Sequence, residues 1–287
     1  MADAVERHAA AAAAIGAAAA RDYPRLWAAE AIPPALWSAM AEAGLLGLST
    51  AERYGGAGLS TDEIARVGRA FVRASGVQGL VTAWQAHNLM ADWVFGHFAS
   101  EGQRQAWSPR IAAGAASVAF AVSEPGAGAH PKRLSARAEL EGDGYRISGR
   151  KAYVTNGPIA SVFAIVAVVD EDANGRKSYG AFLVPADAPG LKILPSEHVD
   201  FLKPSGHASL ELDGVFAPAM ARLTSAADVY PIMVMPLRDH EDAAGAWTRL
   251  GAYERLAEAL AATPDLAGKA GAIWARLRAV ETVLEND

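Results

Sequence analysis

The spacing of apolar residues changes twice along this chain. Up to about residue 115 the apolar side chains recur at helical spacing; then they alternate, and helical spacing returns after about residue 222. A helix buries one face with a period near 3.6 residues, whereas a strand does so with a period of two. The 287 residues are therefore predicted to form an α+β protein with an N-terminal helical domain (1–115), a β domain (116–222) and a short C-terminal helical domain (223–287).

Local signals place the ends of the predicted helices. A Pro-Pro pair at 33–34 opens one helix, and Gly44 ends it. Ser60 and Glu63 are three residues apart, which is the spacing of a capping box at the start of a helix. By the same reasoning, further helices are predicted at 80–98, 103–113, 236–262 and 266–284.

The middle of the chain carries strand patterns. Residues 134–140 and 145–148 alternate, and the Gly-Asp-Gly sequence between them predicts a hairpin turn. Residues 161–169 are continuously apolar and partly β-branched, which is typical of a buried strand. Residues 207–213 alternate again. Such a series predicts an antiparallel β-barrel or sandwich.

Composition excludes several classes of function. The net charge is −6, so no basic face for nucleic acid is expected. The absence of cysteine removes disulfides, thiolate nucleophiles and thiolate metal sites. His87 and His97 do not share a helix face, so no metal site is predicted.

The start of the chain does not resemble a targeting segment. Residues 9–20 are mostly alanine, and Asp3 and Glu6 precede them where a secretory signal has basic residues. Alanine favours helix strongly, so this run predicts a helix. No segment approaches the roughly 20 uncharged apolar residues of a membrane span. A cytoplasmic protein without a membrane span is therefore expected.

Two short phrases carry the strongest functional signal. Residues 123–128 read Ser-Glu-Pro-Gly-Ala-Gly, and residues 151–157 read Lys-Ala-Tyr-Val-Thr-Asn-Gly. Gly126 and Gly128 lack a Cβ, so backbone amides near them can approach an anion closely. The two phrases together predict a loop and a strand end that bind a flat anionic cofactor, most simply a flavin.

These phrases stand in an order that resembles the acyl-CoA dehydrogenase family. The resemblance extends from about residue 36 to about residue 260 and implies a helical, then β, then helical fold with FAD as the cofactor. The phrases that carry it lie at 52–59, 102–114, 120–128, 149–157, 203–208 and 212–218.

The resemblance assigns roles to individual residues. It implies that the Val122 amide and the Ser123 hydroxyl bind the pyrimidine edge of the flavin. Thr155 would lie near the flavin N5, and Tyr153 would form the aromatic wall where most relatives have tryptophan. The full set that it implies for the cofactor is Phe120, Val122, Ser123, Gly126, Gly128, Tyr153 and Thr155.

One family position differs in this chain. Relatives usually have serine and then aspartate after the second glycine, but here these are Ala129 and His130. That serine typically binds the cofactor phosphate or the pantetheine of acyl-CoA, so one anchor is missing. His130 is either a substitute donor or an ordinary polar loop residue.

The resemblance also suggests a catalytic base. Compared with complete relatives, the chain resembles a C-terminally shortened member, and in many relatives the base lies in the later helices. A minority place a glutamate on the first helix after the barrel, where this chain has Glu241, with Asp242 beside it. Glu241 is the predicted base; the alternative is that it belongs to a solvated polar run.

The implied reaction introduces a Cα–Cβ double bond into an acyl-CoA or acyl-carrier thioester, as in fatty acid metabolism. An electron-transfer flavoprotein is an expected acceptor, and a homo- or hetero-oligomer is expected. Two alternatives remain open: a catalytically silent subunit that pairs with a full-length partner, and a flavin-dependent monooxygenase relative.

Overall fold

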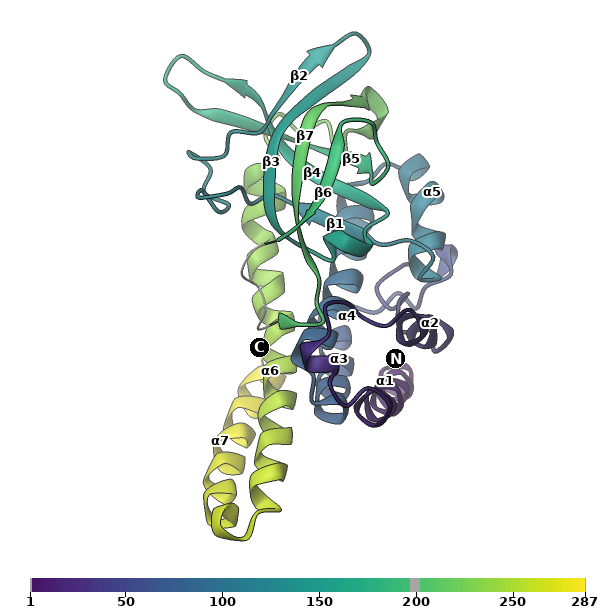
Figure 1. The fold of residues 1–287 in the computed structure, drawn as a ribbon, viewed down its shortest axis with the longest axis vertical. Helices are drawn as coiled ribbons and strands as arrows, with labels where there is room; N and C mark the ends of the chain where they lie inside the picture. Colours follow the sequence, from purple (N-terminus) through teal and green to yellow (C-terminus); the bar gives the residue numbers. More distant parts are fainter. Residues whose placement is uncertain (1, 197–201, 287) are drawn as a thin grey trace.

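The computed structural model describes residues 2–196 and 202–286 (Figure 1). Helices come first, a sheet follows, and two long helices complete the described chain. The N-terminal helices are α1 (Ala2–Asp22), α2 (Pro34–Glu42), α3 (Thr61–Ser75), α4 (Gln78–Met90), the π-helical η3 (Ala91–Phe98) and α5 (Glu101–Ala112). After the sheet come the π-helical turn η7 (Tyr230–Val234), α6 (Met235–Ala261) and α7 (Ala267–Asn286).

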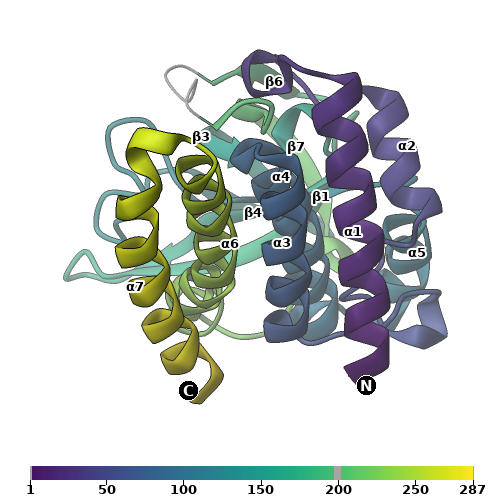
Figure 2. The same cartoon turned by 90° about the horizontal axis from the view of Figure 1, so that it is seen from below.

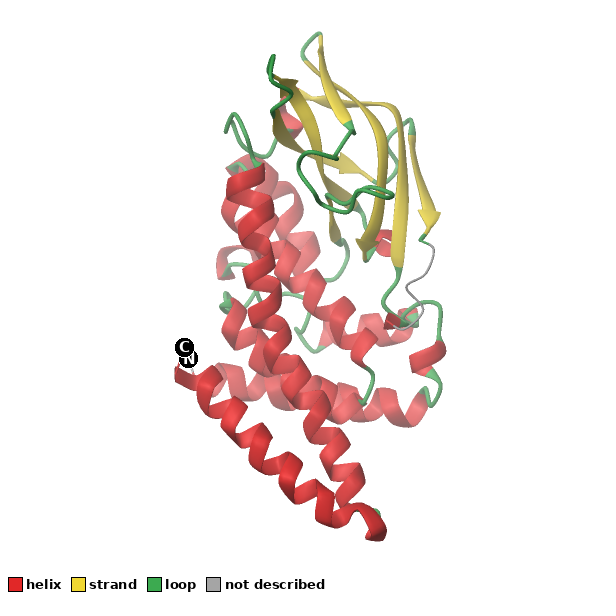
Figure 3. Ribbon diagram, turned by 90° about the vertical axis from the view of Figure 1, so that its left-hand side faces the viewer, coloured by secondary structure: helices red, strands yellow, loops and turns green. Residues whose placement is uncertain are grey.

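The long helices form a layer. Seen from below, α7, α6, α3 and α1 lie side by side, and the sheet lies behind them (Figure 2). The sheet occupies one end of the molecule, and α6 runs from beside it down to the opposite end (Figure 3). Within residues 2–196 and 202–286, no helix is both long and apolar enough to cross a membrane.

The predicted helix ends are confirmed where the signal is local. The Ser60 side chain accepts from the Glu63 amide and the Glu63 carboxylate accepts from the Ser60 amide, so the capping box is present. Gly44 has φ +71° and follows Ala43, the C-cap of α2, as a glycine that ends a helix does. The helix predicted at 80–98 instead changes to π-helix after Met90.

The β domain is one seven-stranded sheet within the described residues. Its strands are β1 (Val118–Ala121), β2 (Arg137–Glu141), β3 (Gly144–Thr155), β4 (Val162–Glu171), β5 (Lys177–Pro185), β6 (Leu191–Pro195) and β7 (His207–Pro218). The order is β1-β4-β2-β3-β7-β6, and β5 pairs with β4 outside this path. The predicted hairpin is present, since Glu141 pairs with Gly144.

The sheet is mixed rather than wholly antiparallel. β1 runs parallel to the first half of β4, with Val118 opposite Val162, and β2 meets the far end of β4 in parallel at Arg137 and Val168. The other strand pairs are antiparallel. Parallel neighbours require long connections, so local turn signals do not reveal them.

β4 is buried on both faces, which explains its unbroken apolar sequence. Its even-numbered residues, such as Val162 and Val166, join a core that includes Trp93 of η3 and Leu237 of α6. Its odd-numbered residues, such as Phe163, join a second core between the strands. The first core therefore attaches the start of α6 to the sheet.

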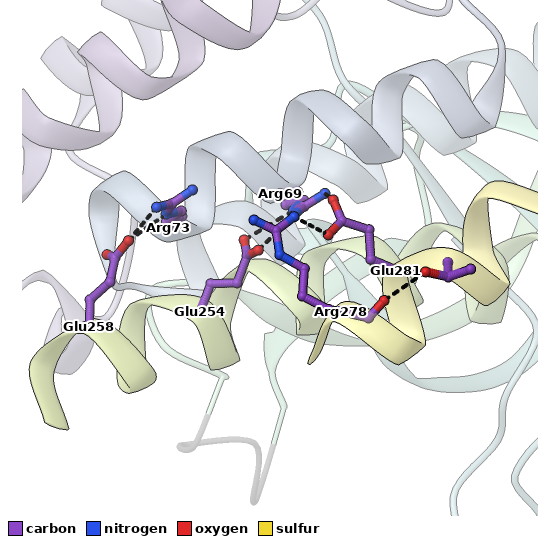
Figure 4. Close-up of polar contacts among 7 residues, drawn as sticks. Arg69, Arg73, Glu254, Glu258, Arg278 and Glu281 are labelled. Atoms are coloured by element: carbon purple, nitrogen blue, oxygen red, sulfur yellow. Dashed lines mark hydrogen bonds and ion pairs between the residues drawn. The ribbon is translucent and has the colours of Figure 1, made fainter. Parts of the chain in front are cut away.

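Charged residues attach the second half of α6, and also α7, to α3 (Figure 4). Arg69 on α3 donates to Glu254 on α6 at 2.5 Å and to Glu281 on α7 at 2.7 Å. Glu254 is only 2% exposed. A Cβ on Gly251 would lie 2.4 Å from the Arg69 carbonyl oxygen, so this glycine lets the two backbones approach closely.

We predict that Arg69→Ala lowers the free energy of unfolding by about 3 kcal/mol, because it leaves the buried Glu254 carboxylate without its partner. Arg73→Ala is the matched control, because Arg73 lies one turn away and its ion pair with Glu258 is half exposed. This variant should lower the free energy of unfolding by less than about 1 kcal/mol. Urea unfolding measures both, and equal losses would contradict the assigned role of Arg69.

Candidate active site

A cleft of about 830 Å³ opens between the sheet and the first turns of α6. α4, the end of β1, β3 and η7 also contribute to its wall. Six of the sequence-predicted site residues line this one cleft: Phe120, Val122, Ser123, Tyr153, Thr155 and Glu241. Asp242, the alternative base, lines it as well.

The segment after β1 forms one side of the cleft. Val122 is buried, whereas Ser123 is partly exposed to the cleft. Among the described residues, the hydroxyls of Ser123 and Thr155 have no hydrogen-bond partner. Both hydroxyls are therefore available to a ligand.

A buried ion pair holds this segment to β3. Lys151 Nζ lies 2.9 Å from Glu124 Oε1 and also donates to the Val122 carbonyl at 3.0 Å. The Glu124 carboxylate accepts further hydrogen bonds from Ser135 and the Ala136 amide. Burial alone would raise the pKa of Glu124, but Lys151 and these donors hold it below its usual value.

Tyr153 has a backbone conformation that is rare for its residue type. Its φ is +59°, and the pairing of β3 with β7 is interrupted between Lys151 and Val154. Large side chains usually avoid this region, and such outliers gather at functional sites. Tyr153 lies at this bulge, is 54% exposed as a residue and lines the cleft.

Asn156 fixes the end of β3 next to Thr155. Its Nδ2 donates to the Ala83 carbonyl of α4 at 2.7 Å, and its φ is also positive, at +59°. Asn156 is 2% exposed. The strand end is thereby attached to the helical part of the molecule.

The loop that contains Gly126 and Gly128 was predicted to offer backbone amides to an anion, but part of it is closed by its own hydrogen bonds. Gly126 and Gly128 have φ of +71° and +57°, so the turn itself requires glycine. The Gly128 amide donates to the Glu124 carbonyl at 3.0 Å and is therefore not free for an anion. Neither glycine lines the cleft.

Glu241 lies on α6 in the cleft wall. Its side chain is exposed within the open cleft, yet the surrounding protein removes part of its hydration and raises its pKa. The neighbouring Asp242 raises the pKa further, and Arg238 opposes this effect. A raised pKa is typical of a carboxyl group that exchanges protons with a ligand.

Trp93 of η3 holds the start of α6 in place. Its Nε1 donates to the Met233 carbonyl at 3.0 Å, and its ring packs on His240 at 4.7 Å between centroids. His240 directly precedes Glu241. Sequence reasoning missed this contact and the Lys151–Glu124 pair, because both join segments that are far apart in the sequence.

Two family models match the chain. The N-terminal domain of acyl-CoA dehydrogenases matches residues 3–115, and their middle domain matches residues 119–215. The chain belongs to the acyl-CoA dehydrogenase family. The acyl-CoA dehydrogenase FadE12 of Mycobacterium tuberculosis is 30% identical over 65% of this chain and 47% of its own length. The probable acyl-CoA dehydrogenase YngJ of Bacillus subtilis is 32% identical over 65% of this chain and 49% of its own length.

The fold is also that of solved members. Butyryl-CoA dehydrogenase from Megasphaera elsdenii superposes with a TM-score of 0.84 at 18% identity, over 98% of this chain and 78% of that one. A glutaryl-CoA dehydrogenase from Mycobacterium smegmatis, solved with FADH2, gives 0.75 at 24% identity, over 88% and 64% of the two chains. The chain spans about half the length of the relatives that it matches in sequence.

We predict that Lys151→Met lowers the free energy of unfolding by about 3 kcal/mol, because Glu124 then stays buried without a cation. The adjacent Arg150→Met is the control, since the Arg150 side chain is 70% exposed and pairs with Glu211 on the surface. This variant should lower the free energy of unfolding by less than about 1 kcal/mol. Denaturant unfolding of the two variants distinguishes them, and a stable Lys151→Met protein would refute the importance of the pair.

Proposed function

We propose that this protein is an FAD-dependent oxidoreductase that introduces a Cα–Cβ double bond into an acyl thioester, with Glu241 as the base. One observation carries the proposal: Ser123, Tyr153 and Thr155 line the same cleft as Glu241. These residues come from three separate parts of the chain, so the fold brings a carboxyl group and the predicted flavin-binding residues to one cleft.

The residues present fit a flavin. Phe120 and Val122 provide an apolar surface, and Tyr153 provides an exposed aromatic ring. The free hydroxyls of Ser123 and Thr155 would bind the polar edge of the ring system. When bound, FAD would accept the hydride that leaves the substrate β-carbon.

Glu241 would remove the proton from the substrate α-carbon. That proton is weakly acidic, so its removal requires a carboxylate close to it and sheltered from water. Partial loss of hydration in the cleft already raises the pKa of Glu241. A substrate that fills the cleft would displace more water and strengthen this effect.

The acyl group would be carried by coenzyme A or by a carrier protein. The relatives include an L-prolyl-[peptidyl-carrier protein] dehydrogenase of Pseudomonas fluorescens, which is 34% identical over 57% of this chain. Other relatives are named as acyl-CoA dehydrogenases. Both substrate classes present the acyl group as a thioester, so the same base and cofactor would act on either.

We predict that Glu241→Gln abolishes anaerobic bleaching of the bound flavin by acyl-CoA or acyl-carrier thioesters, while FAD stays bound. Asp242→Asn is the control, and it should still bleach. Stopped-flow absorbance of the flavin measures both variants. A colourless wild-type protein that takes up no FAD would refute the proposal, and bleaching lost in Asp242→Asn alone would move the base to Asp242.

We also predict the pH dependence of the reaction. Only the carboxylate form of Glu241 accepts a proton, so the rate of bleaching should rise with pH and reach half its maximum above the ordinary glutamate pKa of about 4.3. Asp242→Asn removes a negative neighbour, so this midpoint should shift to lower pH. A pH–rate profile with an unshifted midpoint in Asp242→Asn would contradict the electrostatic coupling.

A further inference from the structure

A second pocket, separate from the cleft, lies against the π-helix η3. Its volume is about 250 Å³, and its wall is formed by residues 49–51, the short helix at 52–54, η3 and α5. It shares no lining residue with the cleft. Pockets for drug-sized ligands usually have volumes of about 300–1,000 Å³, so this pocket suits a smaller molecule. π-helical segments also occur frequently at functional sites.

Asp92 of η3 brings a carboxylate to this second pocket. Its side chain is 32% exposed, and partial burial raises its pKa. In the part of the chain that the structure describes, the carboxylate accepts no hydrogen bond, and its one ion-pair neighbour is His97, with 3.7 Å between Oδ2 and Nδ1. A Cβ on Gly96 would lie 2.4 Å from Asp92 Oδ1, so the glycine leaves room for the carboxylate.

Two arginines bring positive charge to the same pocket. Arg104 of α5 donates to two carbonyls of η3, from Nε at 2.6 Å and from Nη2 at 3.1 Å, which fixes its guanidinium. The Arg53 side chain is 63% exposed, and its Nη2 lies 3.9 Å from Glu101 Oε2. Across residues 2–196 and 202–286, neither arginine forms an ion pair with Asp92. The pocket therefore holds both signs of charge without a direct contact between them.

Two buried hydroxyl groups complete the wall. Thr50 is 7% exposed and Ser108 is 4% exposed, and both line the pocket. Neither hydroxyl has a hydrogen-bond partner among the residues that the structure describes, and neither oxygen is sealed inside the protein. Buried polar groups normally have partners. These two hydroxyls are therefore open to a ligand in the pocket.

We propose that this pocket binds a small zwitterion of the amino-acid type, with its ammonium group at Asp92 and its carboxylate at Arg53 and Arg104. The hydroxyls of Thr50 and Ser108 would donate to the same carboxylate. The inference goes beyond the proposed function, because it concerns a ligand that the cleft does not bind.

The distribution of charge selects this class of ligand. Asp92 would repel a simple anion, and the two arginines would repel a simple cation. A molecule that carries both charges forms a favourable contact with each group at once. Hydrogen bonds between charged partners are also stronger than those between neutral groups.

Wild-type protein and matched probes test the site. Thermal melts with each proteinogenic amino acid in turn should identify at least one that raises the melting temperature. That amino acid is then titrated by calorimetry beside its N-acetyl derivative, which lacks the cation, and its amide, which lacks the anion. Each derivative should bind about tenfold more weakly or worse.

Substitutions assign the two ends of the ligand. Asp92→Asn keeps the shape of the side chain and removes its charge, so it should weaken binding about tenfold. Arg53→Met should weaken binding as well. Arg110→Met is the control, because it removes an exposed arginine of α5 outside the pocket and should leave the affinity unchanged. A melt without ligand that equals that of the wild type shows that each variant is folded.

The probes decide the proposal even if a variant does not fold. If no amino acid raises the melting temperature, the site is refuted. If the N-acetyl derivative or the amide binds as tightly as the parent amino acid, the pocket does not recognise a zwitterion and the proposal is wrong. Flavin bleaching depends on other residues, so the failure of the proposed reaction would leave these results unchanged.

Discussion

The buried ion pair between Lys151 and Glu124 joins two segments of the cleft that lie far apart in the sequence. Lys151 belongs to β3, two residues before Tyr153, and Glu124 follows Ser123 in the segment after β1. The same carboxylate accepts from the residues that lead into β2. Because neither charge can reach water, separating these segments would expose unpaired ions inside the protein. The pair thus fixes the position of Ser123 relative to Tyr153 and Thr155.

The other wall depends on a different contact. α6 is attached to the sheet through the core around β4 and through Trp93, which donates to Met233 of the preceding η7 and packs on His240 of α6. Glu241 follows directly, so its position depends on apolar packing and not on the sheet ladder. The two walls are therefore fixed independently, one by a charge pair and the other by an aromatic side chain.

The sequence alone could predict those structural features that depend only on neighbouring residues. The capping box at Ser60, the helix end at Gly44 and the β2–β3 hairpin each need only neighbouring residues. The parallel pairing of β1 with β4 could not be predicted in this way, since a four-residue strand takes its register from a distant partner. Lysine and glutamate usually indicate surface, so nothing local reveals that Lys151 is fully buried. The cleft residues were found from phrases that resemble a family, whereas their meeting with Glu241 required the docking of α6.

α6 also connects the cleft mechanically to the far end of the molecule. It is continuous from Met235 to Ala261, so Glu241 and Glu254 belong to the same helix. At 1.5 Å per residue they lie about 20 Å apart along its axis. A tilt of about 5° around the Arg69 contact would move the Glu241 backbone by nearly 2 Å. Displacements of about 1 Å already slow reactions that require close alignment. A partner that displaces the distal half of α6 would therefore also displace the Glu241 side chain in the cleft.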